Sequence, residues 1–291
     1  MILLELLISG LTLGGLYALT AMGLTLQYGV ARIMNLAYGE FLIAAAFGAY
    51  LLFNHLQISP LVSLLVAIPA GFAVQWAVYQ VLLMPLVYRT GAGPALEVDS
   101  ILLTFGLSFV VLGICVVAFG GNLYSYSYLA QPVDLLGSQV SANRLVAMGF
   151  AFAMTLLLYL LLTRTRAGTA VRAVAVSPRF APLVGIDVRA VSAFAFGIGG
   201  ALLAASGVLV SMFLPFSASM GVVFAMKALI VVIMGGSGNL PGCLAAGLLL
   251  GFAETLVARL VDPGLTLTVN FALFLLVLLI RPTGLFGRSA R

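Results

Sequence analysis

Charged residues are scarce in this 291-residue sequence: Asp, Glu, Lys and Arg make up 7% of it, against about 25% in an ordinary soluble domain. So little ionic surface would not keep a water-soluble fold in solution. Apolar residues make up 63% of the chain, and its mean hydropathy is +1.24. A helical bilayer span needs about 20 mostly apolar residues. The composition therefore predicts an all-α integral membrane protein with short loops.

The residues that carry most enzyme chemistry are also few. The sequence has one histidine, His55, and neither a metal-binding HExxH motif nor a serine at a nucleophile elbow. It has no P-loop, because its glycine-rich stretch lacks the Gly-Lys-Ser/Thr ending of that motif. We therefore expect no enzyme activity, no metal site and no cofactor bound by this chain.

Cysteine and lysine are rare, and each scarcity excludes a class of protein. The two cysteines, Cys115 and Cys243, lie inside separate apolar stretches, which favours small buried residues over a disulfide or a metal pair. Of the 13 cationic residues only Lys227 is a lysine, and the arginines do not form one block. The net charge of +5 is therefore no sign of a nucleic-acid partner.

Apolar windows predict about eight or nine membrane-spanning helices in a single domain over residues 1–291. The N-terminal residues 1–7 have no basic n-region, so we expect the first window to be a retained span rather than a signal peptide. The windows cover residues 6–26, 36–53, 61–83, 101–119, 145–162, 191–213, 222–234, 243–257 and 265–280.

Arginine placement predicts the orientation in the membrane, because short cytoplasmic loops are enriched in Lys and Arg. Residues 163–189 contain five arginines, and the C-terminal tail contains Arg281, Arg288 and Arg291. An even number of windows separates the two regions, so both can lie in the cytoplasm, with the N-terminus outside. The loop 120–143 is then external, and its tyrosines are favoured as interface anchors over a ligand cage.

A glycine-rich stretch, residues 235–242, separates the seventh and eighth windows, each of which is shorter than a full span. This predicts a break between two short helices, and two interpretations stay open. The break could be a tight turn that lets helices pack closely, as the Gly247-xxx-Gly251 spacing allows. It could instead be a broken element that lines a transport path.

Three ionisable residues lie inside apolar windows, where burying a charge is costly unless it is paired or solvated: Glu40, Lys227 and Glu254. At about 1.5 Å per residue, Lys227 lies roughly 12 Å and Glu254 roughly 18 Å from the glycine-rich stretch. They can pair directly only if the lysine side chain is extended. Glu254 is the residue best placed for an ion-coupled carrier. For Glu40 a local charge pair with Arg32 at the membrane surface is the favoured interpretation.

The arginine-rich loop carries a helix-start signature. Ser177-Pro178 supplies an N-cap acceptor and then a residue that has no amide donor to satisfy, while Gly185 suits a helix stop. We expect a short cytoplasmic helix over residues 178–184 that exposes Arg179 and Phe180. Docking in a partner's groove and contact with lipid headgroups are equally compatible with this surface.

Several blocks of sequence carry a resemblance to a known family. The first block runs from Gly14-Gly15-Leu16-Tyr17 to Asn35-Leu36-Ala37-Tyr38-Gly39-Glu40. The second block is Arg166-Ala167-Gly168-Thr169-Ala170-Val171-Arg172-Ala173. The third block contains Lys227, Gly235-Gly236-Ser237-Gly238-Asn239, Pro241-Gly242 and Glu254. The ending Arg281-Pro282-Thr283-Gly284-Leu285-Phe286-Gly287 also matches. In this order the blocks resemble the LivH-type permease subunits of bacterial ABC importers for branched-chain amino acids. Tyr38 stands where that family usually has histidine.

The resemblance implies a subunit of an ATP-driven importer in the bacterial inner membrane. Its partners would be a second, LivM-like permease, two cytoplasmic ATPase subunits that use the ATP, an external substrate-binding protein and the membrane lipid. The cargo would be branched-chain, hydrophobic amino acids. Urea, short amides or other amino acids are alternatives within the family, and an ion-coupled secondary transporter is the rival from another class.

The resemblance and the residue patterns together nominate two sets of functional residues. The ATPase-coupling loop, at about residues 163–190, is expected to use Arg166, Gly168, Arg172, Ala173, Arg179, Phe180 and Gly185. The translocation path is expected to include Asn35, Glu40, Lys227, Gly235, Gly236, Gly238, Pro241 and Glu254.

Overall fold

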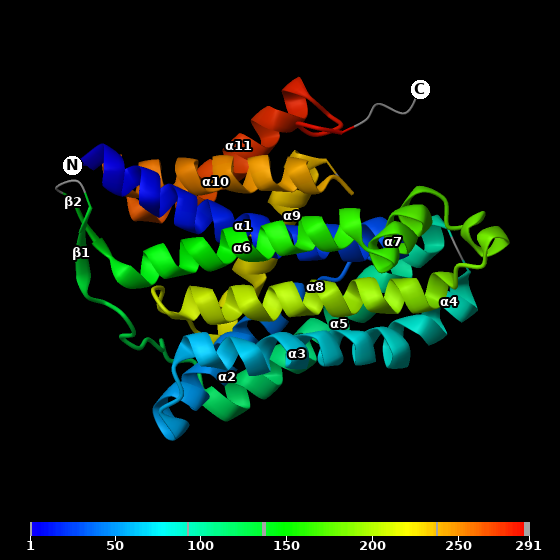
Figure 1. Cartoon of the computed structure of the whole chain (residues 1–291), viewed down its shortest axis with the longest axis horizontal. Coiled ribbons are helices and arrows are strands. Elements are labelled where there is room, and N and C mark those ends of the chain that lie inside the picture. The colour runs from blue at the N-terminus through cyan, green and yellow to red at the C-terminus, as the bar shows by residue number, and fades with distance from the viewer. Residues whose placement is uncertain (1, 92, 136–137, 237, 288–291) are drawn as a thin grey trace.

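The computed structural model describes residues 2–91, 93–135, 138–236 and 238–287, and this part of the chain is a bundle of long helices (Figure 1). Arg288 and Arg291, on which part of the orientation argument rests, lie outside the described residues. The α-helices are α1 (Ile2–Ala31), α2 (Tyr38–Leu56), α3 (Pro60–Val78), α4 (Met84–Thr90), α5 (Pro94–Phe119), α6 (Ala142–Arg164), α7 (Arg166–Val176), α8 (Val188–Ser211), α9 (Gly221–Gly235), α10 (Leu240–Leu260) and α11 (Thr266–Ile280).

Shorter elements join the helices. A π-helical stretch, η1 (Tyr79–Leu83), continues α3 into α4, and three 3-10 turns are η2 (Ala181–Val184), η3 (Ala218–Met220) and η4 (Pro263–Leu265). The strands β1 (Pro132–Leu135) and β2 (Ser138–Ser141) form an antiparallel hairpin between α5 and α6, a feature that the sequence did not predict.

Nine helices in the described ranges are long and apolar enough to cross a membrane, which confirms the predicted all-α membrane fold. They follow the nine apolar windows in order. The break after the seventh span is also confirmed, but α10 has 21 residues and is not the short helix that the window suggested.

Helices α1 and α8 form the centre of the bundle. In the most apolar window of each span, 89% of the residues of α8 and 72% of those of α1 are buried, against 11% for α5 and for α11. Small residues permit this packing: Gly200 of α8 lies against the backbone of Gly71 and the side chain of Gln75 in α3. The peripheral α5 and α11 keep most of their apolar surface exposed, as expected of helices that face lipid or another chain.

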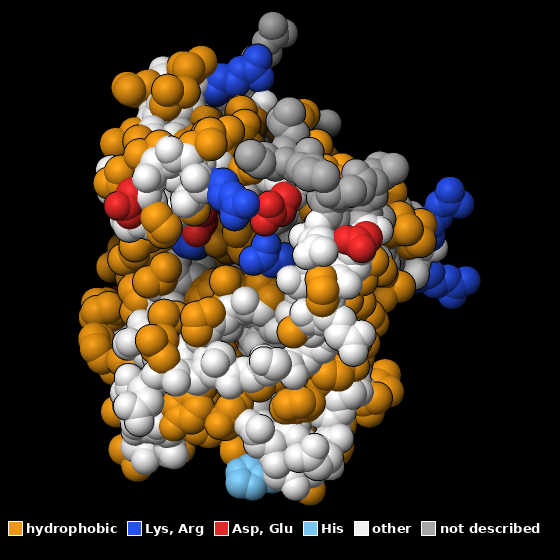
Figure 2. Space-filling model, turned by 90° about the vertical axis from the view of Figure 1, so that its left-hand side faces the viewer, with side chains coloured by type: hydrophobic (Ala, Val, Ile, Leu, Met, Phe, Trp, Pro, Cys, Tyr) orange, Lys and Arg blue, Asp and Glu red, His pale blue; other side chains and the backbone are white. Residues whose placement is uncertain are grey.

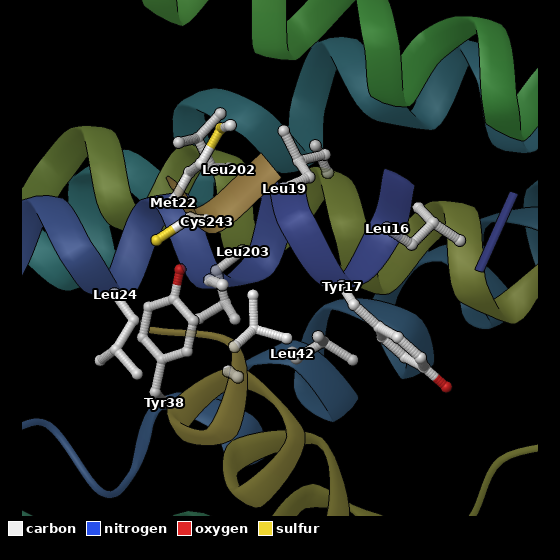
Figure 3. Close-up of a cluster of buried hydrophobic side chains, with 14 of the residues drawn as sticks. Leu16, Tyr17, Leu19, Met22, Leu24, Tyr38, Leu42, Leu202, Leu203 and Cys243 are labelled. Carbon is white, nitrogen blue, oxygen red and sulfur yellow. The ribbon is translucent and has the colours of Figure 1, made fainter. Parts of the chain in front are cut away.

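Tyr38, at the first residue of α2, belongs to this central core. It is fully buried, and its hydroxyl lies 3.0 Å from the Thr20 carbonyl of α1 and 3.2 Å from the Gly199 carbonyl of α8. Figure 3 shows the ring beside Leu24, with the hydroxyl pointing towards the α1 ribbon. Tyr38 therefore acts here as a packing residue whose hydroxyl links two helices.

The bundle has two distinct ends (Figure 1). The N-terminus and the β1–β2 hairpin lie at one end, and α4 and α7 lie at the other. This places the external loop and the arginine-rich loop of the sequence analysis at opposite ends, as the predicted topology requires. We call the end that holds α7 the coupling end and the other the hairpin end.

Candidate functional site

The coupling end is built around α7, an amphipathic helix that follows α6 after one residue. Thr165 caps it, because its hydroxyl accepts a hydrogen bond from the Gly168 amide at 3.0 Å. Gly168 is buried against the backbone of Leu161 and Leu162 at the end of α6, where any larger residue would push the two helices apart. Arg166 and Arg172, on the same helix, are exposed.

The predicted helix over residues 178–184 is reduced to one 3-10 turn, η2, which ends at the predicted residue. The helix of this loop is α7, which ends at Val176, and only the 3-10 turn η2 follows. The reason is the cap: the Thr165 side chain starts the helix, whereas the Ser177 side chain caps nothing. The stop signal is confirmed, because Gly185 adopts a left-handed backbone (φ 76°) and its amide donates to the carbonyls of Ala181 and Pro182.

An apolar patch covers the outer side of this loop. Four large side chains there are more than half exposed, and Phe180 is 67% exposed. Arg179 is exposed next to them, while Ala173, on α7 itself, is half-buried. The members of this coupling patch are Val176, Phe180, Leu183 and Val184. An apolar cluster beside a row of arginines, on a loop between two spans, is typical of a protein-binding surface.

The glycine-rich turn also lies at the coupling end. Gly235 packs against Gly242, with room for no side chain, and Gly236 and Gly238 both have positive φ values of 95° and 85°. Pro241 occupies the first turn of α10, where its missing amide costs nothing. The turn is therefore a tight helix–helix connection, which supports the first of the two interpretations of the sequence.

The C-terminal segment clamps this turn. The Leu285 amide donates to the Met234 carbonyl at 2.7 Å, and the Asn239 side-chain amide donates to the Phe286 carbonyl at 2.8 Å. Between the turn, the end of α1 and α7 lies a cavity of about 260 Å³, whose lining includes Gly238 and Arg172. The glycine-rich turn and the coupling helix are thus neighbours in space, although about 65 residues separate them.

A buried polar network joins four helices near the middle of the bundle. Lys227 of α9 donates to the Glu254 carboxylate of α10 at 2.7 Å and to the Tyr17 hydroxyl of α1 at 2.8 Å. The other Glu254 oxygen accepts from the Asn270 side chain of α11 at 3.1 Å. The lysine does extend to form the direct pair, and the network satisfies both charges inside the membrane-spanning region.

The connection between α1 and α2 falls where the sequence analysis separates the first two apolar windows, but its burial was not predicted. Its residues 33–37 are irregular, yet Ile33, Asn35 and Ala37 are buried. The Asn35 amide nitrogen donates to the side-chain oxygens of Gln27 (3.3 Å) and Gln75 (3.2 Å). Irregular backbone at this depth is tolerated because protein groups satisfy it.

The expected pair between Glu40 and Arg32 does not form. Within the described residues the ion pairs are Lys227–Glu254 and Glu5–Arg259. Glu40 is only 2% exposed and its carboxylate lies against Gly221 at the start of α9, with one oxygen lacking a hydrogen-bond partner, whereas Arg32 is exposed. The α1–α2 break turns the chain back into the bundle, which separates the two residues.

Comparison with known proteins identifies the family. The family model described as "Branched-chain amino acid transport system / permease component" matches residues 6–278. The chain belongs to this family. It is 29% identical over 298 residues to the high-affinity branched-chain amino acid transport system permease protein LivH of Salmonella typhimurium. The aligned region covers 96% of this chain and 94% of the relative.

Other relatives agree. The permease protein BraD of Pseudomonas aeruginosa is 29% identical over 303 residues, with 98% of this chain and 96% of the relative covered. A protein of Methanocaldococcus jannaschii named as a probable branched-chain amino acid transport permease, LivH, is 26% identical, with 94% and 89% covered. No solved structure shows a significant match.

In this permease the nominated path residues fall into three separate groups. Lys227 and Glu254 pair in the middle of the bundle, Asn35 and Glu40 flank the α1–α2 break, and the glycines and Pro241 lie at the coupling end. Glu40, Lys227 and Glu254 were nominated as ionisable residues in apolar windows, and Asn35 belongs to the first block that carries the family resemblance. The missed signal was three uncharged polar residues, because they too are costly to bury without partners: Gln75 and Asn270 lie inside apolar windows, and Gln27 directly follows one.

Proposed function

We propose that this chain is a membrane-spanning permease subunit of an ATP-driven importer for branched-chain amino acids in the bacterial inner membrane. It works with a second, LivM-like permease, two cytoplasmic ATPase subunits and an external substrate-binding protein. Membership of the permease family and the names of the relatives support this assignment. The chain supplies the path, and the ATPase subunits supply the energy.

The coupling patch is the observation that carries the proposal. Phe180 and Leu183 are exposed on a loop beside Arg179, a surface of the kind that a separate subunit can cover. Exposed apolar side chains of this size are costly in water, and they become favourable when a partner's groove covers them. An ATPase subunit that docks here would bury the patch.

Helix α7 connects this patch to the rest of the bundle. Its buried face, Val171 and Val174, packs into the same core as α1 and α6, so a displacement of α7 displaces the helices that it touches. ATP can drive transport only if the ATPases bind the two states of the permease with different affinity. The ATPase subunits would bind with different affinity to the two positions of α7.

The orientation follows from the same assignment. With the coupling patch in the cytoplasm, the C-terminal segment that clamps the glycine-rich turn is also cytoplasmic. The β1–β2 hairpin and the N-terminus then face outwards, where the substrate-binding protein docks. Arg32 and Arg89, exposed near the coupling end, agree with the enrichment of arginine on the cytoplasmic side.

The test is co-purification of the tagged chain with its partners in mild detergent. We expect two ATPases and a second permease, and we expect Phe180→Glu to lose the ATPases, because the variant places a charge in the apolar contact. Leu123→Glu is the matched control: Leu123 is equally exposed, at 66%, but lies in the loop at the hairpin end. It should leave ATPase binding unchanged.

Two outcomes would contradict the proposal. If Phe180→Glu retains the ATPases as fully as Leu123→Glu, the coupling patch is not the docking surface. If the wild-type chain is purified alone and takes up substrate without ATP, in a manner that collapses with the proton or sodium gradient, the ion-coupled secondary transporter is the correct class.

A further inference from the structure

A cavity of about 330 Å³ opens at the hairpin end, away from the coupling patch and the glycine-rich turn. Its size lies at the lower end of the range of small-molecule sites. Its walls come from the first turns of α1, the start of α6, the last turns of α10 and the segment after α8. Figure 2 shows this end of the molecule, where acidic and basic side chains gather close together in the upper half of the view.

The cavity combines three kinds of lining. Arg144 supplies a cation, Glu254 supplies a carboxylate at the edge of the central network, and Phe213 and Leu214 supply an apolar wall. A free α-amino acid with a branched aliphatic side chain presents the three complementary groups: a carboxylate, an ammonium and an apolar chain. We propose that this cavity is the entry site for the amino acid, with Arg144 receiving the carboxylate and Glu254 the ammonium.

Arg144 is held ready for an anion. One of its terminal nitrogens donates to the Ser9 hydroxyl at 2.9 Å, and its backbone carbonyl lies 3.4 Å from the Thr12 hydroxyl, so both contacts fix it against α1. It is half-buried, and among the described residues no carboxylate lies within ion-pair distance of it. A partly desolvated guanidinium that forms no direct ion pair favours a bound carboxylate, which its planar fork of donors matches.

Glu254 is fixed in the same way on the other side. Its residue is only 9% exposed, and its two oxygens accept from Lys227 and Asn270. A carboxylate has about four acceptor positions, so two hydrogen bonds leave capacity for an ammonium group. Because the side chain is locked before the ligand arrives, binding requires little ordering of this group.

The rim of the cavity carries a second, looser ion pair. Arg259 donates to Glu5 at 2.9 Å, and both side chains are well exposed, at 55% and 35%. Exposed pairs of this kind contribute little stability, so the rim can separate at small cost. The pair therefore leaves access to Arg144 and Glu254 from the hairpin end, which the proposed function places outside the membrane.

This inference rests on the proposed function, and ligand analogues test it directly. The intact wild-type complex, in nanodiscs and without the binding protein, should bind leucine at least tenfold more tightly than 3-methylbutylamine, which lacks the carboxylate, or 4-methylpentanoate, which lacks the ammonium. Arg144→Gln should lose at least tenfold in affinity for leucine and 4-methylpentanoate and leave the amine unchanged, which corresponds to about 1.4 kcal/mol or more.

Two further variants complete the design. Arg144→Lys keeps the charge and should recover part of the leucine affinity, and Arg89→Gln, an exposed arginine near the coupling end, is the matched control that should bind all three ligands as the wild type does. Glu254→Gln should show the complementary pattern, with affinity lost for leucine and for the amine and unchanged for 4-methylpentanoate.

The inference is overturned if wild-type complex does not bind leucine, or if Arg144→Gln weakens all three ligands equally or none of them. It is also overturned if the substitution leaves leucine binding intact and instead changes the retention of anionic lipid, because the lipid phosphate is then the anion that Arg144 holds. ATP-driven leucine uptake by the same preparations, with the binding protein added, separates the two proposals. Wild-type uptake together with unaltered binding by Arg144→Gln rejects the cavity and leaves the proposed function standing.

Discussion

The buried pair of Lys227 and Glu254 offers a prediction whose size follows from its surroundings. The two side chains are 2.7 Å apart, and only 10% and 12% of their surfaces are exposed. Glu254→Gln removes the negative charge and leaves the Lys227 ammonium buried against Tyr17, without a counter-charge. Breaking a buried pair from one side costs about 3–5 kcal/mol, because the remaining charge stays desolvated.

Removing both charges should restore most of that loss. In the double variant, Lys227→Met with Glu254→Gln, no buried charge remains, and the glutamine can still accept the hydrogen bond from Asn270. Replacing a buried ion pair with neutral groups of similar volume is often neutral or stabilising. The pair is therefore expected to contribute little net stability, although each single substitution is severe.

Thermal unfolding of the detergent-purified protein measures this pattern. We expect Glu254→Gln to lower the Tm by about 6 °C or more, and the double variant to return close to the wild-type value. Leucine affinity should remain low in both, because the carboxylate is missing in both. Equal Tm values for the wild type and the single variant would refute the reasoning, since Lys227 would then be tolerated without its partner.

Three further predictions follow from other contacts. Gly247→Ala should destabilise the protein by about 1–3 kcal/mol, because the new Cβ would lie 2.6 Å from the Ala18 backbone nitrogen. Gly149→Ala is the control: its new Cβ would have no atom within 4 Å, so the same Tm measurement should show a neutral or slightly stabilising effect. Asn35→Ala should cost about 1–3 kcal/mol by leaving Gln27 and Gln75 without their shared donor, and limited trypsin digestion should cut faster at the exposed Arg32. Burial raises the pKa of the Tyr126 phenol to about 12. The stability that this shift contributes is present below pH 10 and is lost as the pH rises towards 12. Tyr126→Phe should therefore lose less stability than the wild type over that pH range, which a series of Tm measurements at increasing pH would show.

The sequence was sufficient for the spans, because the physics of a span is local. A run of apolar residues such as those of α5 or α11 crosses a membrane whatever surrounds it, and nine such runs became nine helices in the described residues. The break at the glycine-rich stretch could be predicted for the same reason. Gly236 and Gly238, which have positive φ values, and Pro241 beside them are signals of a helix break that can be recognised in the local sequence.

Features that depend on distant contacts could not be predicted in this way. The α1–α2 break is stable because Gln75, 40 residues away in the chain, accepts a hydrogen bond from Asn35. The Gly247-xxx-Gly251 spacing indicated a close helix contact, which exists, but its partner is α1 rather than the neighbouring α9. Glu40 was assigned to Arg32 because the two are close in sequence, and the fold separates them.

Helix α1 is the element that connects the proposed functional regions. Its successive turns hold Arg144 through Ser9, Lys227 through Tyr17, and Asn35 through Gln27. Along its length, small residues bring it into close contact with α10, and we expect the two helices to move as one unit. The natural hinges are then the irregular segments that interrupt the neighbouring helices, at the α1–α2 connection and at the glycine-rich turn beside α7. A movement imposed on α7 would reach the cavity at the hairpin end through this pair, which is how the proposed ATPase subunits at one end would control access to the proposed substrate site at the other.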